Sequence, residues 1–418
     1  MSEWKEYKMS DLIDDISMGP FGSNIKVDCF VGQGVPVLNG SNLVGFKLCE
    51  KSFNYVTKDK ADSLGHSNAY RGDVIVTHRG TLGQIAYIPY DSKYERYVIS
   101  QSQFRFSCKK ELVNIVFLVY YFHSREGQFK LLSNASQVGV PALARPTSTF
   151  KEIYIKLPPI EEQKRIAGVL SSLDDKIDLL NRENVTLEAL AETLFRHYFI
   201  ENPDPTWKEG KLGDYVNETI GGEWGKETPE EDYNMPVRCL RGADVADLND
   251  GLAKRTPLRY IKHSKYDKIE PHSGDIILEI SGGTDTCSTG RVAYINEDVK
   301  RLFDYPIVFS NFCRLLRVKE DYTYFVYCYF RHLHKQGEFF NLENGSSGIH
   351  NLNYKAALYD DLGWPVPTDE KLVIEFGENV KPYFDKINTN KKQILSLSAQ
   401  RDTMLPRLMS GEVKVCER

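Results

Sequence analysis

The feature that most constrains the fold is an internal repeat with an offset of about 200 residues in a chain of 418. The segment Gly72–Val76, for example, recurs as Gly274–Leu278. Six segments recur in one order: Gly34–Leu43 as Met235–Val245, Arg71–Val76 as Ser273–Leu278, Gly83–Ile88 as Gly290–Ile295, Val98–Phe106 as Ile307–Leu315, Phe117–Phe122 as Phe325–Phe330, and Ile153–Pro159 as Leu358–Pro367. Because six matches in one order, each offset by about 200 residues, leave little room for chance, we interpret the chain as a tandem duplication.

Each copy predicts a mixed α/β domain. Short β-branched and aromatic runs bounded by Gly, Asn, Asp and Pro are typical of strands, and an aromatic helix candidate follows them. We expect a first α+β domain over residues 1–157, a central helix over 158–202, a second α+β domain over 203–367 and a C-terminal helix over 368–418.

Each copy closes with a long heptad pattern, the first from Ile160 to about Phe199. The seam residues are Ile166, Leu170, Leu173, Ile177, Leu180, Asn184, Leu187 and Leu194 in the first, and Val380, Ile387, Asn390, Ile394 and Leu397 in the second. A helix of about 39 residues spans about 58 Å, too long to be buried by one small domain. We therefore expect the two helices to pair as a coiled coil, antiparallel if the repeats are related by a pseudo-twofold axis.

Two details of the predicted seam stay open. Asn184 and Asn390 occupy polar slots, where they either fix the register of the coiled coil or lie at exposed seam positions. Pro382 lies inside the second helix, where a kink or a restart is expected.

Composition excludes several classes of protein. The chain is 41% hydrophobic and 27% charged, which excludes general disorder, and it has no apolar run near the length of a membrane span. Its net charge of −5 argues against a strongly basic nucleic-acid-binding protein, but not against a nucleic-acid-binding protein whose basic residues lie on one face. The start of the chain lacks a secretory pattern, and eight scattered cysteines favour reduced thiols, so we expect a cytoplasmic protein.

The sequence offers little for catalysis. Asp275 and Glu279 lack the following lysine of a metal-dependent nuclease, because Ser281 stands there, and turn aspartates before buried strands explain them better. The glycine-rich segment Thr219–Gly225 lacks the spacing of a nucleotide-binding loop. We expect a non-catalytic chain with no metal and no cofactor of its own.

A duplicated unit joined by two rigid helices suggests recognition of two features at a fixed spacing. Duplex DNA fits such a layout, since half-sites one helical turn apart lie about 34 Å from centre to centre. A duplicated protein-interaction scaffold fits the duplication equally well.

Several motifs resemble those of the specificity subunit of type I restriction–modification enzymes, and together they span essentially the whole chain. They are Gly34–Leu38 with Asn42, Gly72–Val76, Leu157–Ala167 (LPPIEEQKRIA), Leu173–Ile177, Leu194–Phe199 and Met404–Val413 (MLPRLMSGEV). The segment Pro365–Lys371 departs from the paired-proline form at the second helix, which puts equal docking of the two helices in doubt.

The resemblance implies two target-recognition domains, each reading half of a bipartite, asymmetric site in double-stranded DNA. It implies that the two helices form an antiparallel coiled coil that sets the gap and docks two methyltransferase subunits. Two restriction/translocase subunits would complete the enzyme, and S-adenosylmethionine, ATP and Mg would be used by those partner subunits. A modification-only system is a further possibility, and the scaffold remains the rival class.

Side chains that can read base edges or phosphates lie on the predicted loops and strand ends. His78 and Arg79, between two strand candidates, are the strongest, although an exposed hairpin turn explains them equally well. The candidates of the first copy are Ser23, Asn24, Lys26, Asn39, His78, Arg79, Thr81, Gln101, Gln103, Arg105, Gln137 and Arg145. Those of the second are Arg238, Arg241, Thr284, Asp285, Arg291, Asn311, His350 and Asn351. Because the second loop is longer and lacks the basic pair, the two copies should read different sequences.

Overall fold

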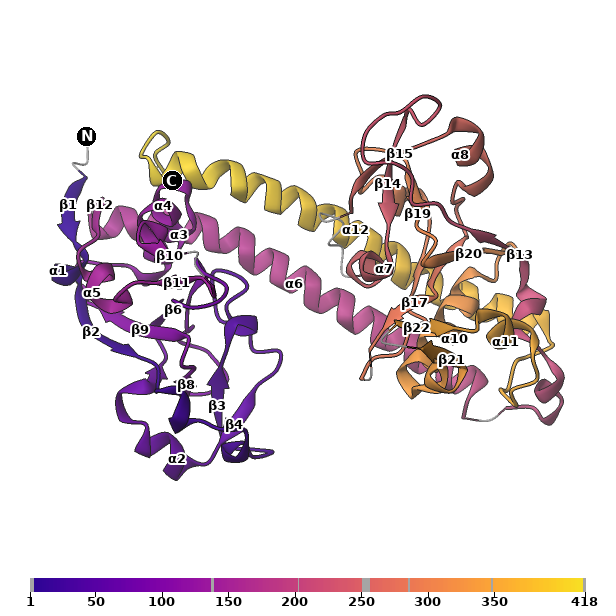
Figure 1. The fold of residues 1–418 in the computed structure, drawn as a ribbon, viewed down its shortest axis with the longest axis horizontal. Coiled ribbons are helices and arrows are strands. Elements are labelled where there is room, and N and C mark those ends of the chain that lie inside the picture. The colour runs from indigo at the N-terminus through magenta and orange to yellow at the C-terminus, as the bar shows by residue number, and fades with distance from the viewer. Residues whose placement is uncertain are drawn as a thin grey trace. The chain divides into compact units, whose positions relative to one another are not determined.

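The computed structural model describes residues 4–136, 139–201, 203–249, 256–284, 286–346 and 349–415. The chain forms two compact units, unit 1 from Met1–Ile177 with Leu397–Arg418, and unit 2 from 178–396 (Figure 1). The division falls inside both long helices, so each unit contains one part of each helix.

Unit 1 is built around two four-stranded sheets, ordered β2-β9-β6-β7 and β4-β3-β8-β5, with the pairs β1-β12 and β10-β11 beside them. Its strands are β1 (Lys5–Lys8), β2 (Ile13–Met18), β3 (Val35–Leu38), β4 (Asn54–Val56), β5 (Asn68–Tyr70), β6 (Val74–Thr77), β7 (Ile85–Tyr87), β8 (Arg96–Ile99), β9 (Gln103–Cys108), β10 (Ala135–Ser136), β11 (Ala142–Leu143) and β12 (Tyr154–Leu157). Its shorter helices are α1 (Met9–Leu12), α2 (Lys58–Ser63), α3 (Ile115–His123), α4 (Arg125–Leu132) and α5 (Pro146–Lys151).

Unit 2 has sheets ordered β13-β20-β16-β18, β15-β14-β19 and β17-β22-β21. Its strands are β13 (Val216–Gly221), β14 (Met235–Leu240), β15 (Leu258–Ile261), β16 (Ile276–Glu279), β17 (Ser281–Gly283), β18 (Val292–Tyr294), β19 (Ile307–Phe309), β20 (Cys313–Val318), β21 (Glu343–Ser346) and β22 (Ile349–Leu352). Its shorter helices are α7 (Gly242–Asn249), α8 (His263–Ile269), α9 (Glu297–Lys300), α10 (Thr323–Gln336) and α11 (Tyr354–Tyr359).

The two units repeat one topology. The sheet β2-β9-β6-β7 corresponds to β13-β20-β16-β18, with Val74 opposite Phe106 in one and Ile276 opposite Leu316 in the other. Each unit also contains one parallel pair, β3 with β8 and β14 with β19. The expected mixed α/β duplication is therefore confirmed, and the pairing supplies residue equivalences between the copies.

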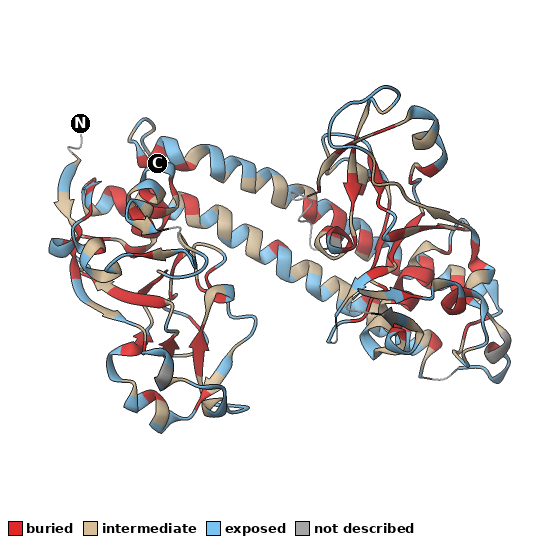
Figure 2. Ribbon diagram, in the orientation of Figure 1, coloured by how far each residue is buried: buried red, intermediate tan, exposed pale blue. Residues whose placement is uncertain are grey.

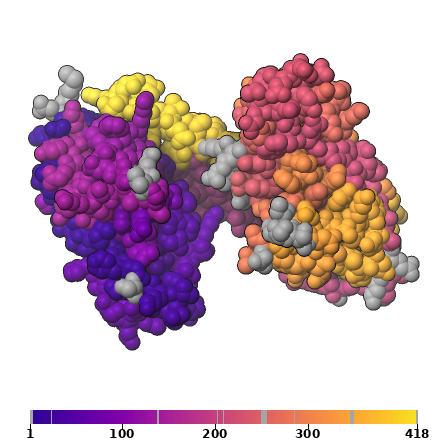
Figure 3. All heavy atoms as spheres, viewed as in Figure 1, coloured from indigo at the N-terminus to yellow at the C-terminus, as the bar shows by residue number. Residues whose placement is uncertain are grey.

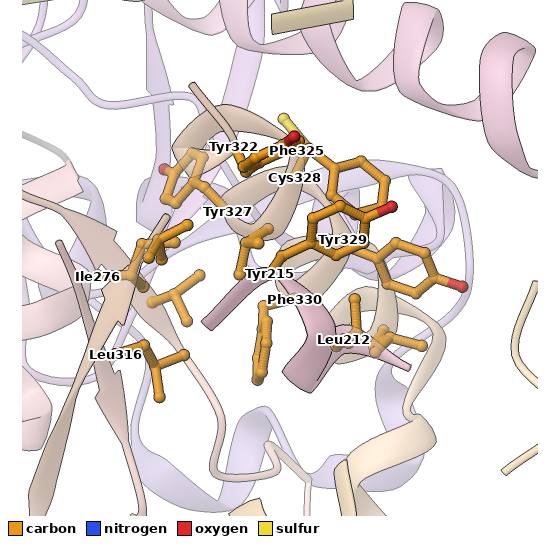
Figure 4. Close-up of a cluster of buried hydrophobic side chains, with 14 of the residues drawn as sticks. Leu212, Tyr215, Ile276, Leu316, Tyr322, Phe325, Tyr327, Cys328, Tyr329 and Phe330 are labelled. Atoms are coloured by element: carbon orange, nitrogen blue, oxygen red, sulfur yellow. The ribbon is translucent and has the colours of Figure 1, made fainter. Parts of the chain in front are cut away.

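Aromatic side chains fill the core of unit 2. The predicted aromatic helix is α10, much of which is buried (Figure 2). Its Phe325, Tyr327, Tyr329 and Phe330 lie in one core cluster with the sheet residues Ile276 and Leu316 (Figure 4). A fully buried aromatic or aliphatic side chain stabilises a fold by about 1.5–3 kcal/mol. The aromatic run therefore serves the core in unit 2, as α3 does in unit 1.

The long helices α6 (Ile160–Phe199) and α12 (Glu370–Met409) run antiparallel in both units. In unit 1 the end of α12 packs on the start of α6, with Leu405 and Leu408 in one core with Ile166 and Leu170. The yellow atoms of α12 are visible along the upper edge of this unit in Figure 3. In unit 2, Tyr198 donates to Glu375 (3.1 Å), and Val380 and Ile387 are buried. The expected antiparallel coiled coil is thus confirmed.

The polar seam residues contact each other in unit 2. Asn390, which is fully buried, donates from Nδ2 to Asn184 Oδ1 and to Glu183 Oε2, at 2.9 Å each. This contact favours the register interpretation over an exposed position. Leu180 is buried in the same seam, whereas Leu173, Ile177, Leu187, Leu194, Ile394 and Leu397 are half-buried.

Helix α12 continues through Pro382, so the expected restart is wrong. A proline removes one backbone donor, and packing of the neighbouring Val380 and Phe384 into the core of unit 2 holds the helix together at that point. No helix in the described part of the chain is long and apolar enough to cross a membrane.

Candidate nucleic-acid interface

Four predicted loops of the first copy meet at one end of the β6–β7 hairpin. The His78 amide donates to Ser102 O, the Leu143 amide to His78 O and the Gly80 amide to Pro141 O, each at 2.8 Å. The Gly19 amide donates to Gln103 O, also at 2.8 Å. Backbone hydrogen bonds thus join residues 19–26, 78–83, 100–103 and 139–145 into what we call loop surface 1.

Loop surface 1 carries three exposed basic side chains, Lys26, Arg79 and Arg145. Within the described ranges, no carboxylate lies within ion-pairing distance of any of them. Arg145 lies in the left-handed region (φ 46°), which is unusual for a residue with a side chain, directly before α5. Asn24, Thr81 and Gln101 are exposed beside them, so the surface combines cations with amides and a hydroxyl.

Two of the predicted readers turn inward. Gln103 is 0% exposed and accepts from the Ser100 amide (3.0 Å). Arg105 is buried between Asp15 (2.7 Å) and Asp73 (3.5 Å). The chain turns between Ser100 and Gln103, and β9 begins only at Gln103, so neither side chain lies on an exposed strand face. Both residues support the loop instead of projecting from it.

His78 and Asn39 are also engaged locally. The His78 ring is half-buried, its Nε2 is buried without a hydrogen-bond partner in the described structure, and burial lowers the pKa of the ring. Asn39 caps the short turn Gly40–Asn42 by accepting from the Ser41 amide at 2.8 Å. Of the pair His78 and Arg79, only Arg79 is exposed.

The second copy repeats this backbone pattern. The Ile280 amide donates to Phe312 O, as His78 does to Ser102, and the Leu352 amide donates to Ile280 O, as Leu143 does to His78, both at 2.9 Å. β17 extends the contact by pairing with β22. Residues 221–225, 280–284, 310–312 and 349–352 form the equivalent loop surface 2.

A close approach of backbones is common to both surfaces. A Cβ on Gly19 would lie 1.9 Å from Ser100 O, and one on Gly222 would lie 2.1 Å from Phe309 O. Both distances are far below van der Waals contact, so only glycine fits at either position. Gly19 and Gly222 therefore occupy equivalent places in the two copies.

The side chains of the second copy differ in kind. Each predicted arginine is paired: Arg238 with Asp304 (2.7 Å), Arg241 with Asp244 (2.8 Å) and Arg291 with Glu279 (2.5 Å). His350 contacts the buried carboxylate of Glu343 at 2.8 Å. The exposed candidates are neutral: Thr284, Asn311 and Asn351.

Comparisons with known proteins identify relatives of this chain. Residues 1–189 match the family described as "Type I restriction modification DNA specificity domain". The MjaIX specificity subunit of Methanocaldococcus jannaschii, a type I restriction enzyme subunit, is 23% identical over 99% of this chain and 94% of its own length. Residues 1–189 thus belong to this specificity-domain family, and nearly the whole chain is similar to a type I specificity subunit.

Two further comparisons cover different lengths. The HindI specificity subunit of Haemophilus influenzae is 25% identical over 59% of this chain and 53% of its own length. The crystal structure of an S subunit of a type I restriction–modification system from M. genitalium has a TM-score of 0.54 and 17% identity, over 97% of this chain and 96% of that one. At 17% sequence identity, this structural similarity supports a shared fold and nothing further.

Three of the predicted site residues cannot be described, and two exposed residues were not predicted. Gln137 and Asp285 lie outside the described residues, as does the side chain of Ser23. The exposed Phe21 and Phe312 were not predicted, because a phenylalanine in a chain of this kind usually packs into a core. The turn Gly19–Gly22 was the available signal for Phe21, since a phenylalanine between Pro20 and Gly22 has no strand or helix face to bury it.

The acidic residues considered for a nuclease have structural partners. Asp275 accepts from the His272 amide (2.7 Å) and lies 3.3 Å from Arg317, and Glu279 pairs with Arg291. Asp73 is the equivalent of Asp275, and burial raises its pKa to about 6. In the described residues, no three His, Cys, Asp or Glu side chains are placed to hold a metal ion.

Proposed function

We propose that this specificity subunit reads a bipartite, asymmetric DNA sequence, with loop surface 1 contacting one half-site and loop surface 2 the other. The observation that carries the proposal is the convergence of four loops in each copy through equivalent backbone hydrogen bonds. The same scaffold presents different side chains, with unpaired cations in one copy and neutral polar groups in the other. Different side chains on one scaffold suit different half-sites.

Free cations favour DNA as the ligand of loop surface 1. Lys26, Arg79 and Arg145 extend into solvent, where phosphate groups can pair with them without breaking an internal ion pair. Gln101 and Asn24 lie among them, and such amides can form paired hydrogen bonds with adenine. The net charge of −5 predicts weak binding by the isolated chain and tighter binding once partner subunits add phosphate contacts.

The helices α6 and α12 would set the distance between the half-sites and dock two methyltransferase subunits, and two restriction/translocase subunits would complete the assembly. In this proposal the chain has no catalytic role and holds no cofactor. S-adenosylmethionine serves the methyltransferase subunits, and ATP and Mg serve the translocase subunits. The family membership and the antiparallel pairing of the two helices support this division of labour.

DNA binding by the chain with its methyltransferase subunits tests the proposal. Fluorescence anisotropy would compare a duplex with the methylated motif and a scrambled duplex at several salt concentrations. Each lost phosphate contact should reduce the slope of log K against log salt by about 0.9. Lys26→Gln or Arg145→Gln should show that loss, whereas Lys5→Gln on β1, an exposed lysine outside both loop surfaces, should not. An assembled complex without preference for any duplex would favour the scaffold.

A further inference from the structure

Each loop surface exposes one aromatic side chain among polar neighbours. Phe21 in loop surface 1 is 84% exposed, and Phe312 in loop surface 2 is 51% exposed. Neither contributes to a core cluster of its unit. An aromatic residue held in water forgoes the stabilisation that burial supplies, so these two positions are not explained by folding.

At the position equivalent to each exposed phenylalanine, the other copy has no exposed aromatic ring. Counting from the equivalent glycines Gly19 and Gly222, Phe21 corresponds to Trp224. Trp224 is half-buried, and the guanidinium of Arg259 covers its ring at 4.0 Å from the centroid. At this position the aromatic ring of the first copy is exposed to solvent, whereas that of the second copy is covered by an arginine of the same copy.

The reverse holds at the second position. Phe312 and Ser102 are equivalent, because their carbonyl groups accept the corresponding hydrogen bonds from Ile280 and His78. Loop surface 1 therefore has a small polar residue where loop surface 2 has its exposed ring. Among the described residues of these two surfaces, each keeps one open phenylalanine, at a different place.

The turn that carries Phe21 is held from both sides. Pro20 before it is buried and restricts the backbone, and Phe21 O accepts from the Asn24 amide at 2.8 Å. A Cβ on Gly22 would lie 2.3 Å from Gln101 Oε1, so this turn touches the turn that bears Gln101. The ring thus projects from an ordered turn, and Gly22 of that turn lies against Gln101, a residue proposed to read a base.

We propose that Phe21 and Phe312 act as wedges that insert at a base step of their half-sites and stack on the unstacked base. The inference rests on the proposed function, because it takes duplex DNA as the ligand of both surfaces. Apolar side chains that insert at a base step partly unstack it and bend the duplex, which makes recognition depend on how easily that step deforms. Contact with the base then covers the ring that folding leaves exposed.

The test uses the full chain with its methyltransferase subunits and a duplex that carries the methylated motif. 2-Aminopurine, whose fluorescence rises on unstacking, would replace one base at a time. The wild-type complex should brighten the probe at one step of each half-site. Phe21→Ala should abolish the signal in one half-site only and weaken binding roughly 5- to 100-fold, while Phe312→Ala should act on the other. Phe21→Trp should retain the signal.

The controls separate the two proposals. Tyr90 is an exposed aromatic residue that lies against Gly72, at the start of β6, whereas loop surface 1 lies at the other end of that strand. Tyr90→Ala should therefore change neither DNA binding nor probe fluorescence. If the wild-type complex prefers the motif but Phe21→Ala leaves both the affinity and the probe signal unchanged, the wedge is refuted and the DNA-reading function stands. If the wild-type complex shows no preference for the motif, the proposed function itself fails.

Discussion

The buried ion pair between Glu279 and Arg291 offers a strong test of the equivalence of the two copies. Glu279 is 1% exposed, and Arg291 donates to it from two nitrogens. The equivalent pair in the first copy is neutral, since Thr77 Oγ1 donates to Gln84 Oε1 at 3.0 Å. We predict that Arg291→Ala destabilises unit 2, whereas the double change Glu279→Thr with Arg291→Gln restores most of the loss.

The magnitude follows from burial. Removing one partner of a buried ion pair costs about 3–5 kcal/mol, because the other charge stays buried without compensation. The side chain of Arg291 is 29% exposed, so water can reach the site and the lower end, about 3 kcal/mol, applies. For a unit of this size about 1 kcal/mol corresponds to 2–4 °C, which gives a fall in Tm of roughly 6–12 °C. The neutral pair should return stability to within about 1 kcal/mol of wild type.

Urea denaturation and thermal unfolding of the full chain, monitored by circular dichroism, would measure these changes. Gln84→Ala in the first copy is the matched control, and it should cost about 1–2 kcal/mol, since it removes two neutral hydrogen bonds, one from Thr77 and one to Gly40 O. The reasoning fails if Arg291→Ala unfolds with the wild-type midpoint. It also fails if the double variant is no more stable than Arg291→Ala.

Three further predictions concern backbone, seam and pH. Gly19→Ala should disrupt loop surface 1 and reduce DNA binding at least tenfold, whereas Gly45→Ala, with nothing within 4 Å of its added Cβ, should not; equal binding by both variants would contradict this. Replacing Asn184 and Asn390 together by Leu should raise stability by about 1–3 kcal/mol in urea denaturation, because the buried Asn390 Oδ1 lacks a partner in the described structure, and a loss would refute it. Since burial raises the pKa of Asp73 to about 6, the folded state binds more protons than the unfolded state between about pH 4 and 6. The free energy of unfolding, relative to Asp73→Asn, should therefore fall by roughly 2 kcal/mol as the pH rises through that window, and a flat difference would contradict the assignment.

The duplication and the helices could be predicted from the sequence because their patterns are local or periodic. The first helix begins at Ile160 and ends at Phe199 as its heptads indicate. The restart expected as one alternative at Pro382 does not occur, because its neighbours Val380 and Phe384 hold the helix through tertiary packing that a local rule does not include.

The interface could be predicted only in part. The loops were identified by their glycines and polar residues, but which side chains project depends on turns that the residue types do not reveal. Gln103 and Arg105 follow a turn that shifts the start of β9 and places both inside unit 1. In the second copy, Arg238 pairs with Asp304 and Arg291 pairs with Glu279. Both carboxylates come from other strands or turns, so these ion pairs cannot be predicted from local sequence.

The most direct test of the account is the methylation pattern that this chain confers on its partner methyltransferase. Methylome sequencing would compare a host that carries both with one that carries the methyltransferase and the Arg79→Ala chain. We predict a bipartite N6-methyladenine motif that depends on this chain, with one half-site relaxed or lost in the variant and the other unchanged. If the complex assembles but no motif depends on the chain, or if the variant leaves both half-sites intact, the assignment of loop surface 1 as a reader of DNA is contradicted.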